Sequence, residues 1–314
     1  MATYNGEKFI SEQLDSLRTQ TYVNWQLVIR DDGSKDNTVP IIREYISRDN
    51  RITLIINETN VRGACANFSS LLSYANNNLA WEYIMFSDQD DIWKSKKIER
   101  SLAAIIALEN NYKNSPALVY TNFELMDSSG GFILGEYKLK HHIRLNNLMS
   151  FNYVFGCTMI FNKQLADKIS NIPFEAENHD YWIALVASIY QSHFLNEKLI
   201  HYRQHSGNAS GNVVGNNTMA SRIRRLIINP EREIGMSRNV LAMLKLFFER
   251  YKDELSHQDK TMLECYFLAF DSNRLAVIYR MLKDKIFKKG FFQTLSSFYQ
   301  VLFFYNRIKA KRQF

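Results

Sequence analysis

Strand-like and helix-like segments alternate along residues 1–121, and this alternation limits the folds open to the chain. Short apolar runs predict strands at 26–30, 52–56, 81–86 and 117–121. Amphipathic patterns predict helices at 7–19, from the Asp36-Asn37 cap to 47, at 64–77 and at 94–108. Strands separated by helices are usually parallel neighbours in one sheet. We therefore predict an α/β fold with a Rossmann-like, mostly parallel sheet and helices on both faces.

The chain becomes less regular after residue 121 and then wholly helical. We expect a strand at 152–161 broken by Gly156-Cys157, helices at 162–169 and 179–189, and a strand at 199–203. A Gly- and Asn-rich loop at 206–217 follows. Beyond it the pattern predicts helices at 219–228, 233–254, 258–285 and 291–309. This change predicts two regions, residues 1–215 and a helical C-terminal region, 216–314.

The positive charge of the chain is concentrated in the second region. Residues 216–314 contain 19 Lys and Arg against 9 Asp and Glu, whereas the rest contains 20 against 23. Such asymmetry indicates an anionic partner, either a membrane surface or nucleic acid. An aromatic stretch at 291–305 lies between basic clusters, which is typical of a helix lying in a membrane interface. A terminal helix packed on its neighbours, or a contact in a homodimer, is the alternative.

Targeting signals and cysteines suggest where the protein works. We see no signal peptide and no apolar run of about 18 residues, so we expect no transmembrane helix. The three cysteines Cys65, Cys157 and Cys265 are far apart, which argues against a disulfide framework or a zinc site. We expect a reducing compartment, the cytoplasm.

The stretch Phe86-Ser-Asp-Gln-Asp-Asp-Ile-Trp93 is the strongest local signal of function. Its carboxylates Asp88, Asp90 and Asp91 follow a predicted strand, so they lie at the carboxyl edge of the sheet, where α/β proteins bind ligands. Carboxylates this close repel one another unless a cation joins them, and Mg²⁺ or Mn²⁺ prefers oxygen ligands. An acidic turn that caps the next helix is the alternative.

Four motifs in order resemble the family 2 inverting glycosyltransferases of GT-A fold. They are Ala2-Thr-Tyr-Asn-Gly6, Asp31-Asp32-Gly33-Ser34, the acidic stretch and His179-Asp180, and the resemblance covers about residues 1–210. Two further pieces, Ser87-Asp-Gln-Asp-Asp-Ile-Trp93 and His201-Tyr-Arg-Gln-His-Ser-Gly-Asn208, resemble the bacterial branch that includes rhamnosyltransferases. Relatives carry a hydrophobic strand before the first motif, and here that strand is essentially missing.

The resemblance implies how the first region holds a nucleotide. Thr3 and Tyr4 match the segment that packs on the base, and Asp31 matches the acid that hydrogen-bonds it. Asp32 is expected to be structural. Arg62 lies in a loop that reaches the nucleotide in relatives.

The resemblance also implies roles in sugar transfer. Asp88 and Asp90 match an Asp-x-Asp motif, in which the second acid ligates the metal and the first holds the ribose or the metal. Asp180 matches the catalytic base, for which a plain helix N-cap is the alternative. Arg203 and His205 match a basic motif suited to the diphosphate. The implied cofactor is Mg²⁺ or Mn²⁺.

The implied activity is inverting sugar transfer from a nucleotide diphosphate donor to a lipid-linked acceptor or a growing cell-surface polysaccharide, such as a capsule or cell-wall glycan. The branch implies dTDP-L-rhamnose, with UDP-galactose or UDP-N-acetylglucosamine as the rival donor. The implied place is the inner face of the cell membrane, as a peripheral protein. A nucleic-acid-binding protein and a non-catalytic scaffold are the alternatives from other classes, and we find no nucleic-acid reader motif.

Overall fold

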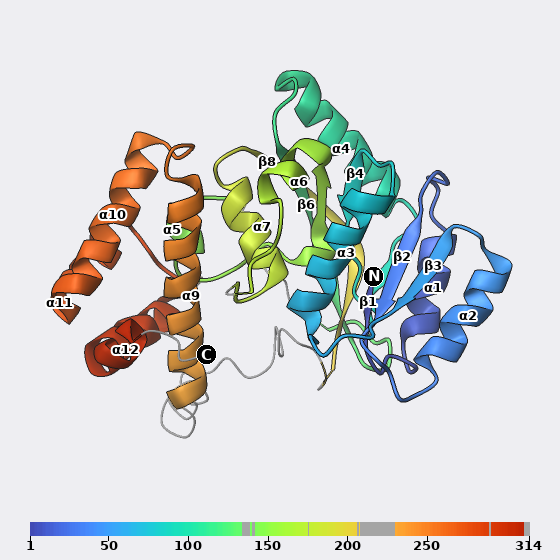
Figure 1. Ribbon diagram of the computed structural model, residues 1–314, viewed down its shortest axis with the longest axis horizontal. Helices are drawn as coiled ribbons and strands as arrows, with labels where there is room; N and C mark the ends of the chain where they lie inside the picture. Colours follow the sequence, from blue (N-terminus) through green and yellow to red (C-terminus); the bar gives the residue numbers. More distant parts are fainter. Residues whose placement is uncertain are drawn as a thin grey trace.

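The computed structural model describes residues 1–133, 139, 142–174, 176–205, 207, 230–288 and 290–310. The loop predicted at 206–217, apart from residue 207, and the helix predicted at 219–228 lie outside the described residues. Described residues form an α/β part, which holds two sheets, and a group of C-terminal helices beside it (Figure 1). The predicted fold class is therefore confirmed.

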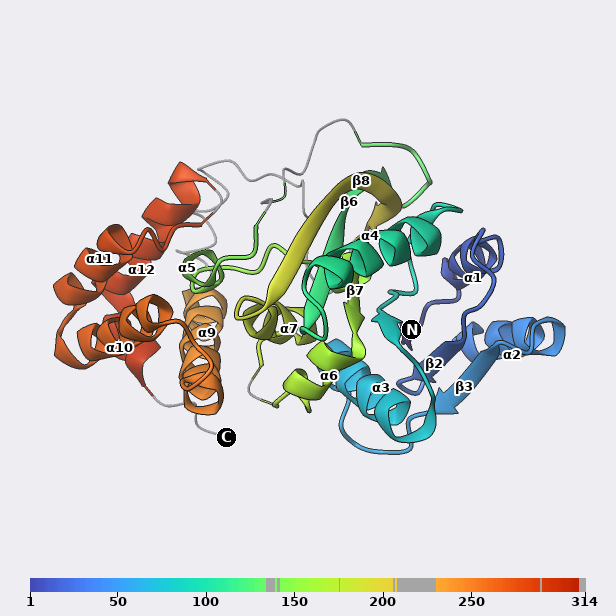
Figure 2. The same cartoon turned by 90° about the horizontal axis from the view of Figure 1, so that it is seen from above.

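The first sheet is parallel, in the strand order β1-β2-β3. Its strands are β1 (Ala2–Thr3), β2 (Leu27–Asp31) and β3 (Ile52–Ile56). The helices that follow them are α1 (Ile10–Arg18), α2 (Thr38–Arg48) and α3 (Ala64–Asn78). Helices α1 and α2 cover one face and α3 the other (Figure 2). Although β1 has only two residues, it pairs with the carboxyl end of β2, so Thr3 lies opposite Asp31.

The second sheet is mixed, in the order β4-β7-β6-β8-β5. Its strands are β4 (Tyr83–Met85), β5 (Ile92–Trp93), β6 (Ala117–Asp127), β7 (Met159–Asn162) and β8 (Gln191–Gln204). Strands β6 and β8 are parallel, and the other pairs are antiparallel. The helices of this part are α4 (Lys97–Asn111), α5 (Leu145–Leu148), α6 (Lys163–Ile169) and α7 (His179–Ala187). Parallel pairing is therefore concentrated in the first sheet and in the β6–β8 pair.

The C-terminal helices pack beside α7 rather than on the sheets. They are α9 (Pro230–Tyr251), α10 (His257–Ser272), α11 (Arg274–Lys283) and α12 (Phe291–Lys309). Trp182 of α7 meets Phe247 and Tyr251 of α9, with ring centroids 6.3 and 6.1 Å apart. This aromatic contact holds α9 against the helix that begins with His179.

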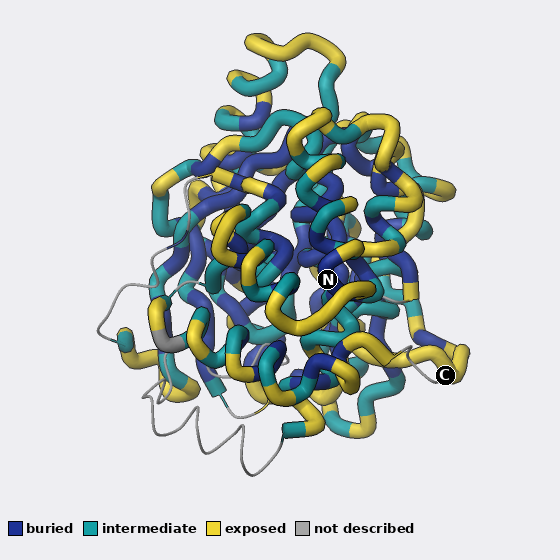
Figure 3. Tube along the Cα trace, turned by 90° about the vertical axis from the view of Figure 1, so that its left-hand side faces the viewer, coloured by how far each residue is buried: buried dark blue, intermediate teal, exposed yellow. Residues whose placement is uncertain are grey.

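One hydrophobic core joins these parts. It contains Leu14 beside the first sheet, Trp182 of α7, Leu244 of α9 and Tyr305 of α12. The buried stretches run through the middle of the molecule and the exposed ones lie around it (Figure 3). Burial of this apolar surface is the main source of stability and fixes α7 between the sheets and α9.

Candidate functional site

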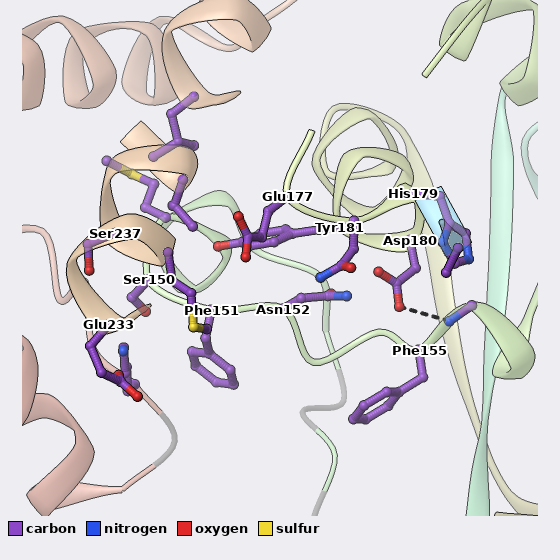
Figure 4. A pocket seen from close by; sticks show the side chains of 18 of the residues that line it. Ser150, Phe151, Asn152, Phe155, Glu177, His179, Asp180, Tyr181, Glu233 and Ser237 are labelled. Carbon is purple, nitrogen blue, oxygen red and sulfur yellow. Dashed lines mark hydrogen bonds between the residues drawn. The ribbon is translucent and has the colours of Figure 1, made fainter. Parts of the chain in front are cut away.

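A large cavity of about 1320 Å³ lies between the carboxyl ends of the strands and the C-terminal helices. Residues from the first sheet, the acidic loop, the start of α7, α9 and α12 line it. Figure 4 shows Asp180 and Asn152 on one side, Glu177 and Tyr181 in the middle, and Ser237 and Glu233 of α9 on the other side. The sequence-predicted residues Thr3, Tyr4, Arg62, Asp88, Asp90 and Asp180 all line this cavity.

The adjacent acids Asp31 and Asp32, at the end of β2, have side chains in different environments. The carboxylate of Asp31 accepts hydrogen bonds from the backbone of Gly33 (3.0 Å) and Ser34 (2.7 Å) and from the hydroxyl of Thr3 (3.0 Å). Asp31 is fully buried and is absent from the described cavity lining, whereas Asp32 is part of it. Asp31 thus braces the turn, and Asp32 faces the open space.

Asp32 is held in place by Arg30 of β2 and by the loop after β3. Its carboxylate accepts from Arg30 (2.8 Å), from the side-chain amide of Asn57 (2.9 Å) and from the backbone of Gly63 (2.8 Å). Arg62, next to Gly63, is exposed on the cavity wall. Its guanidinium passes so near Gly33 that a Cβ there would meet it at 3.2 Å, and Gly33 also has a positive φ of 83°. The carboxylate of Asp32 and the guanidinium of Arg62 therefore lie together in one corner of the cavity.

The acidic loop is tied to the first strand by Gln89. Its side-chain amide accepts from the Tyr4 N–H (2.9 Å) and donates to the Tyr4 carbonyl (3.0 Å). Poor solvation, followed by the charges of Asp90 and Asp180, raises the pKa of Asp88 to about 7. These acids therefore share one electrostatic environment although they come from distant parts of the sequence.

The carboxylates around Asp88 fit a hard divalent cation. Oxygen atoms of Asp88 and Asp91 and the sulfur of Cys157 lie within 4.8 Å of one another. Burial, followed by the charges of Asp90 and Asp88, raises the pKa of Asp91 well above its usual value, so the ionised form of this carboxyl group is poorly stabilised without a cation. Burial also raises the pKa of the Cys157 thiol, which keeps it protonated and a poor ligand for Mg²⁺ or Mn²⁺. The donor set that fits such a cation is the set of carboxylate oxygens.

Arg203 and His205 lie behind the acidic loop. The Arg203 guanidinium is buried, donates to the Asp90 carbonyl (2.9 Å) and to Glu12 (2.7 Å), and lies over the Phe9 ring. Nδ1 of His205 accepts from the Gly207 N–H (3.1 Å), so Nε2 carries the proton and donates to the Asp90 carboxylate (2.7 Å). Both contact Asp90, and neither belongs to the described cavity lining.

Asp180 lies in the first turn of α7, at the wall of the cavity. Its carboxylate accepts from the Gly156 N–H (3.1 Å, dashed in Figure 4). Burial raises its pKa to about 6, because hydrogen bonds to the carboxylate offset only part of the lost solvation. A carboxylate with a pKa near neutrality and access to a cavity is suited to general-base chemistry.

His179 and Gly156 fix the direction of the Asp180 side chain. The His179 ring stacks on Phe68 with centroids 4.1 Å apart, and burial lowers its pKa to about 3, so it is neutral. A Cβ on Gly156 would meet Nε2 of His179 at 2.6 Å. Glycine at this position therefore lets the backbone approach α7 closely enough to hydrogen-bond Asp180.

Several residues of the cavity were not named from the sequence. Gln89, Asn152, Glu177 and the α9 residues Glu233 and Ser237 line it, and Asp32 was expected to be structural. Gln89 lies between Asp88 and Asp90 in the sequence, so its position could have indicated that it lines the cavity. The polar residues Asn152 and Glu177 lie in irregular segments, where no periodicity shows which side chains turn inward.

Comparisons with known proteins agree on one family. A family model described as Glycosyl transferase family 2 matches residues 1–165. The Escherichia coli UDP-Glc:alpha-D-GlcNAc-diphosphoundecaprenol beta-1,3-glucosyltransferase WfgD is 32% identical over 188 residues, which cover 59% of this chain and 68% of that protein. The Shigella flexneri dTDP-rhamnosyl transferase RfbG is 29% identical over 226 residues, which cover 67% of this chain and 73% of that protein.

The solved structures share the fold at lower identity. The crystal structure of S. aureus TarS 1-349 in complex with UDP-GlcNAc aligns with a TM-score of 0.57 and 18% identity, over 90% of this chain and 78% of that one. The crystal structure of GalNAc-T7 with UDP, GalNAc and Mn²⁺ aligns with a TM-score of 0.55 and 10% identity, over 81% of this chain and 53% of that one.

Proposed function

This chain belongs to glycosyl transferase family 2, and we propose that it transfers a sugar, with inversion, from a nucleotide diphosphate donor to an acceptor hydroxyl held beside Asp180. The observation that carries this proposal is the single cavity that joins the acids Asp88 and Asp90 to Asp180. We assign the diphosphate to the acids and the attacking hydroxyl to Asp180.

The nucleoside end of the donor belongs in the corner formed by Thr3, Tyr4, Asp32 and Arg62, which all line the cavity. Tyr4 is 49% exposed and offers a ring on which a base can stack. We assign to Asp32 the role for which the sequence favoured Asp31, because Asp32 lines the cavity and Asp31 does not. Arg62 provides donors that suit ribose or phosphate oxygens.

Asp88 and Asp90 would hold the divalent cation, Mg²⁺ or Mn²⁺, with the donor diphosphate. Burial, followed by the charges of Asp90 and Asp180, raises the pKa of Asp88, and a bound cation would stabilise its ionised form. When bound, the cation supplies Lewis-acid stabilisation of the departing diphosphate. His205 and Arg203 hold Asp90 from behind through its carboxylate and its carbonyl. We assign them to positioning the acidic loop, in place of the direct diphosphate contact that the sequence suggested.

Asp180 acts as the base. Its carboxylate accepts the proton of the acceptor hydroxyl while the oxygen attacks the anomeric carbon from the face opposite the diphosphate. One displacement with one base inverts that carbon. The Gly156 N–H holds the carboxylate in place, and burial keeps its pKa at about 6, so it is ionised at neutral pH and basic enough to take a proton.

For the donor we propose dTDP-L-rhamnose, with a UDP-hexose as the rival. RfbG is named as a dTDP-rhamnosyl transferase, and WfgD is named for UDP-Glc. For the acceptor we propose a sugar on a lipid diphosphate, at a step in the assembly of a cell-surface polysaccharide. WfgD, by its name, acts on a GlcNAc-diphosphoundecaprenol. Assays with both donors on one acceptor would decide between them.

A peripheral contact with the inner face of the membrane would bring the enzyme to such an acceptor. Among the described residues no helix is both long and apolar enough to cross a bilayer. Helix α12 instead exposes a stripe with a spacing of four residues, formed by Phe291, Leu295, Tyr299 and Phe303. Helix α11 exposes a second stripe, Leu275, Tyr279 and Leu282. An interfacial helix has this pattern when basic residues flank it, and a homodimer contact is the alternative.

The substitution Asp180→Asn tests the proposed function. We expect transfer to fall by about 10²–10⁴-fold, because the amide cannot take the proton, while nucleotide-sugar affinity changes little. Single-turnover assays and donor titration calorimetry measure the two quantities. The matched control is Asp253→Asn, which changes an exposed acid outside the cavity. Undiminished transfer by Asp180→Asn would refute the assignment of the base.

A further inference from the structure

The cavity continues well beyond Asp180, between α9 and the helices that follow it. In this second part the wall is largely apolar, with Met236, Val240, Leu244, Phe270, Met281 and Val301. Leu244, Phe270 and Met281 are buried core residues, so the wall is a firm part of the fold. The part near Asp180 differs, because the polar side chains of Asn152 and Glu177 face it (Figure 4).

The size of the cavity exceeds what one small ligand needs. Pockets for single small ligands are about 300–1,000 Å³, and this one is about 1320 Å³. A nucleotide sugar placed along Tyr4, Asp88 and Asp90 leaves the α9 part unfilled, because these residues lie on the opposite side of Asp180 from α9 in the proposed arrangement. The α9 part therefore has room for a second, apolar ligand.

On the basis of the proposed function, we infer that the space between α9 and α12 holds the first part of the hydrocarbon chain of a lipid-linked acceptor. The acceptor sugar then lies between Asp180 and Glu177, where carboxylates can accept hydrogen bonds from its hydroxyls. The chain leaves the sugar toward Val240 and Met236. This assigns an acceptor subsite to the C-terminal helices.

Several polar groups in the α9–α12 part bond to one another, although the buried side-chain nitrogen of Gln300 does not, and this pattern favours a hydrocarbon over a glycan. The Ser237 hydroxyl donates to the buried Gln300 amide (2.7 Å), and the Gln293 amide accepts from the Gly290 N–H (2.9 Å). Ser297 donates to the Gln293 carbonyl (3.3 Å). An extended glycan would need many unused donors and acceptors along its length, whereas a hydrocarbon chain needs apolar contact alone.

The subsite opens on an apolar part of the surface. Met236 and Phe291 line the cavity and are 44% and 72% exposed, so they stand at its mouth. Phe291 also begins the exposed stripe of α12, with Leu295 and Tyr299. A chain that leaves the cavity at this mouth therefore meets an apolar surface that can lie against a membrane.

Binding of a series of linear alkyl diphosphates without a sugar, from about six to ten carbons and below their micelle concentrations, tests the inference. Calorimetry should give an affinity that rises with chain length, by about two- to fourfold for each methylene group that is buried. The variants Met236→Asp and Val240→Asp should remove this dependence. The control Leu268→Asp, which is 67% exposed in the native chain and outside the cavity, should keep it.

Affinity that does not change with chain length, or that keeps its dependence in Met236→Asp, would overturn the inference. Thermal melts and donor titration show that each variant is folded. Met236 is partly exposed, so this variant avoids the folding risk of a core substitution. Donor turnover is measured in parallel: chain-length dependence without turnover of any nucleotide sugar would refute the proposed function and leave the lipid subsite standing. Turnover of a nucleotide sugar without chain-length dependence would refute the lipid subsite and leave the proposed function standing.

Discussion

At the scale of single residues, the solvation of the Asp180 carboxyl group sets the pH range in which the proposed base works. Burial raises its pKa to about 6. The proton is bound below that pH and lost above it, so the base form disappears as the pH falls. We expect kcat to be level above neutral pH and to fall about tenfold per pH unit below about 6.

Initial rates at saturating donor and cation, measured from about pH 5 to 8, give this profile, and the donor Kd at each pH serves as the control. A rate that stays level down to the acid end would show that Asp180 is not the group whose ionisation controls transfer.

If Asp88 and Asp90 bind a divalent cation, that cation should stabilise the folded protein against heat. A cation that binds only the folded protein raises Tm, by several degrees at about 100 times its Kd. We expect Mn²⁺ to raise the Tm of the wild type at pH 8 and Asp90→Asn to lose most of that rise. Asp253→Asn, which changes an exposed acid just after α9, should keep it. An equal rise in Asp90→Asn would exclude Asp90 as a ligand.

The sequence predicted which acids share a cavity better than it predicted which way each one points. Asp88 and Asp90 follow a strand, so the rule for the carboxyl edge of a sheet placed them near a ligand. Asp31 and Asp32 are adjacent and identical, and their directions depend on the phase of β2, which one sequence does not reveal. Arg203 was expected at the diphosphate because it matches a basic motif, and in the structure its guanidinium donates to Glu12 and to the Asp90 carbonyl.

At the scale of elements, the close contact between Gly156 and α7 predicts a separation of catalysis from binding. A methyl group at Gly156 would press on the buried His179 ring at 2.6 Å and displace the first turn of α7. We expect Gly156→Ala to lower kcat by about 10- to 100-fold through misplacement of Asp180. Donor Kd should stay within about twofold, since the nucleoside corner lies on other elements.

Gly235 provides the matched control for that substitution. It lies inside α9, and a Cβ there would meet nothing within 4 Å. We expect Gly235→Ala to raise the free energy of unfolding by about 0.5–1 kcal/mol without changing kcat, because alanine favours a helix. Urea titration measures the first quantity. Equal loss of kcat in both variants would show that the effect does not act through Asp180.

Elements were predictable where one local pattern decides them. The strand at Ile52–Ile56 and the helix at Phe291–Lys309 agree with their expected ranges. The single helix expected at 258–285 is two helices, because Asn273 is extended and its side chain caps α11 by accepting from Leu275 and Ala276. Strand β8 begins at Gln191 and not at Leu199, because pairing with β6 extends it through a largely polar stretch. Long-range pairing of this kind leaves no local signal.

At the scale of the whole molecule, the exposed stripes of α11 and α12 predict binding to anionic vesicles. Apolar side chains enter the interface while nearby basic residues face the lipid head groups. We expect the wild-type protein to float with anionic vesicles, and a variant with Leu275→Asp and Phe303→Asp to stay unbound. Val23→Asp, which changes an equally exposed side chain far from these helices, should behave as the wild type. Vesicle binding by the double variant, or a wild type that forms dimers instead, would contradict the membrane proposal.

The order in which the cavity-lining residues occur along the sequence bears on how enzymes of this kind could diversify. Residues of the proposed donor side fall between Ala2 and Asp90, and those of the proposed acceptor side between Met149 and Ile308, while no described residue from 91 to 148 lines the cavity. A single genetic crossover in that interval would join the donor preference of one ancestor to the acceptor preference of another. Because Arg203 and His205 hold the Asp90 loop from the other half, such a crossover would recombine the two specificities only between parents that share this pair.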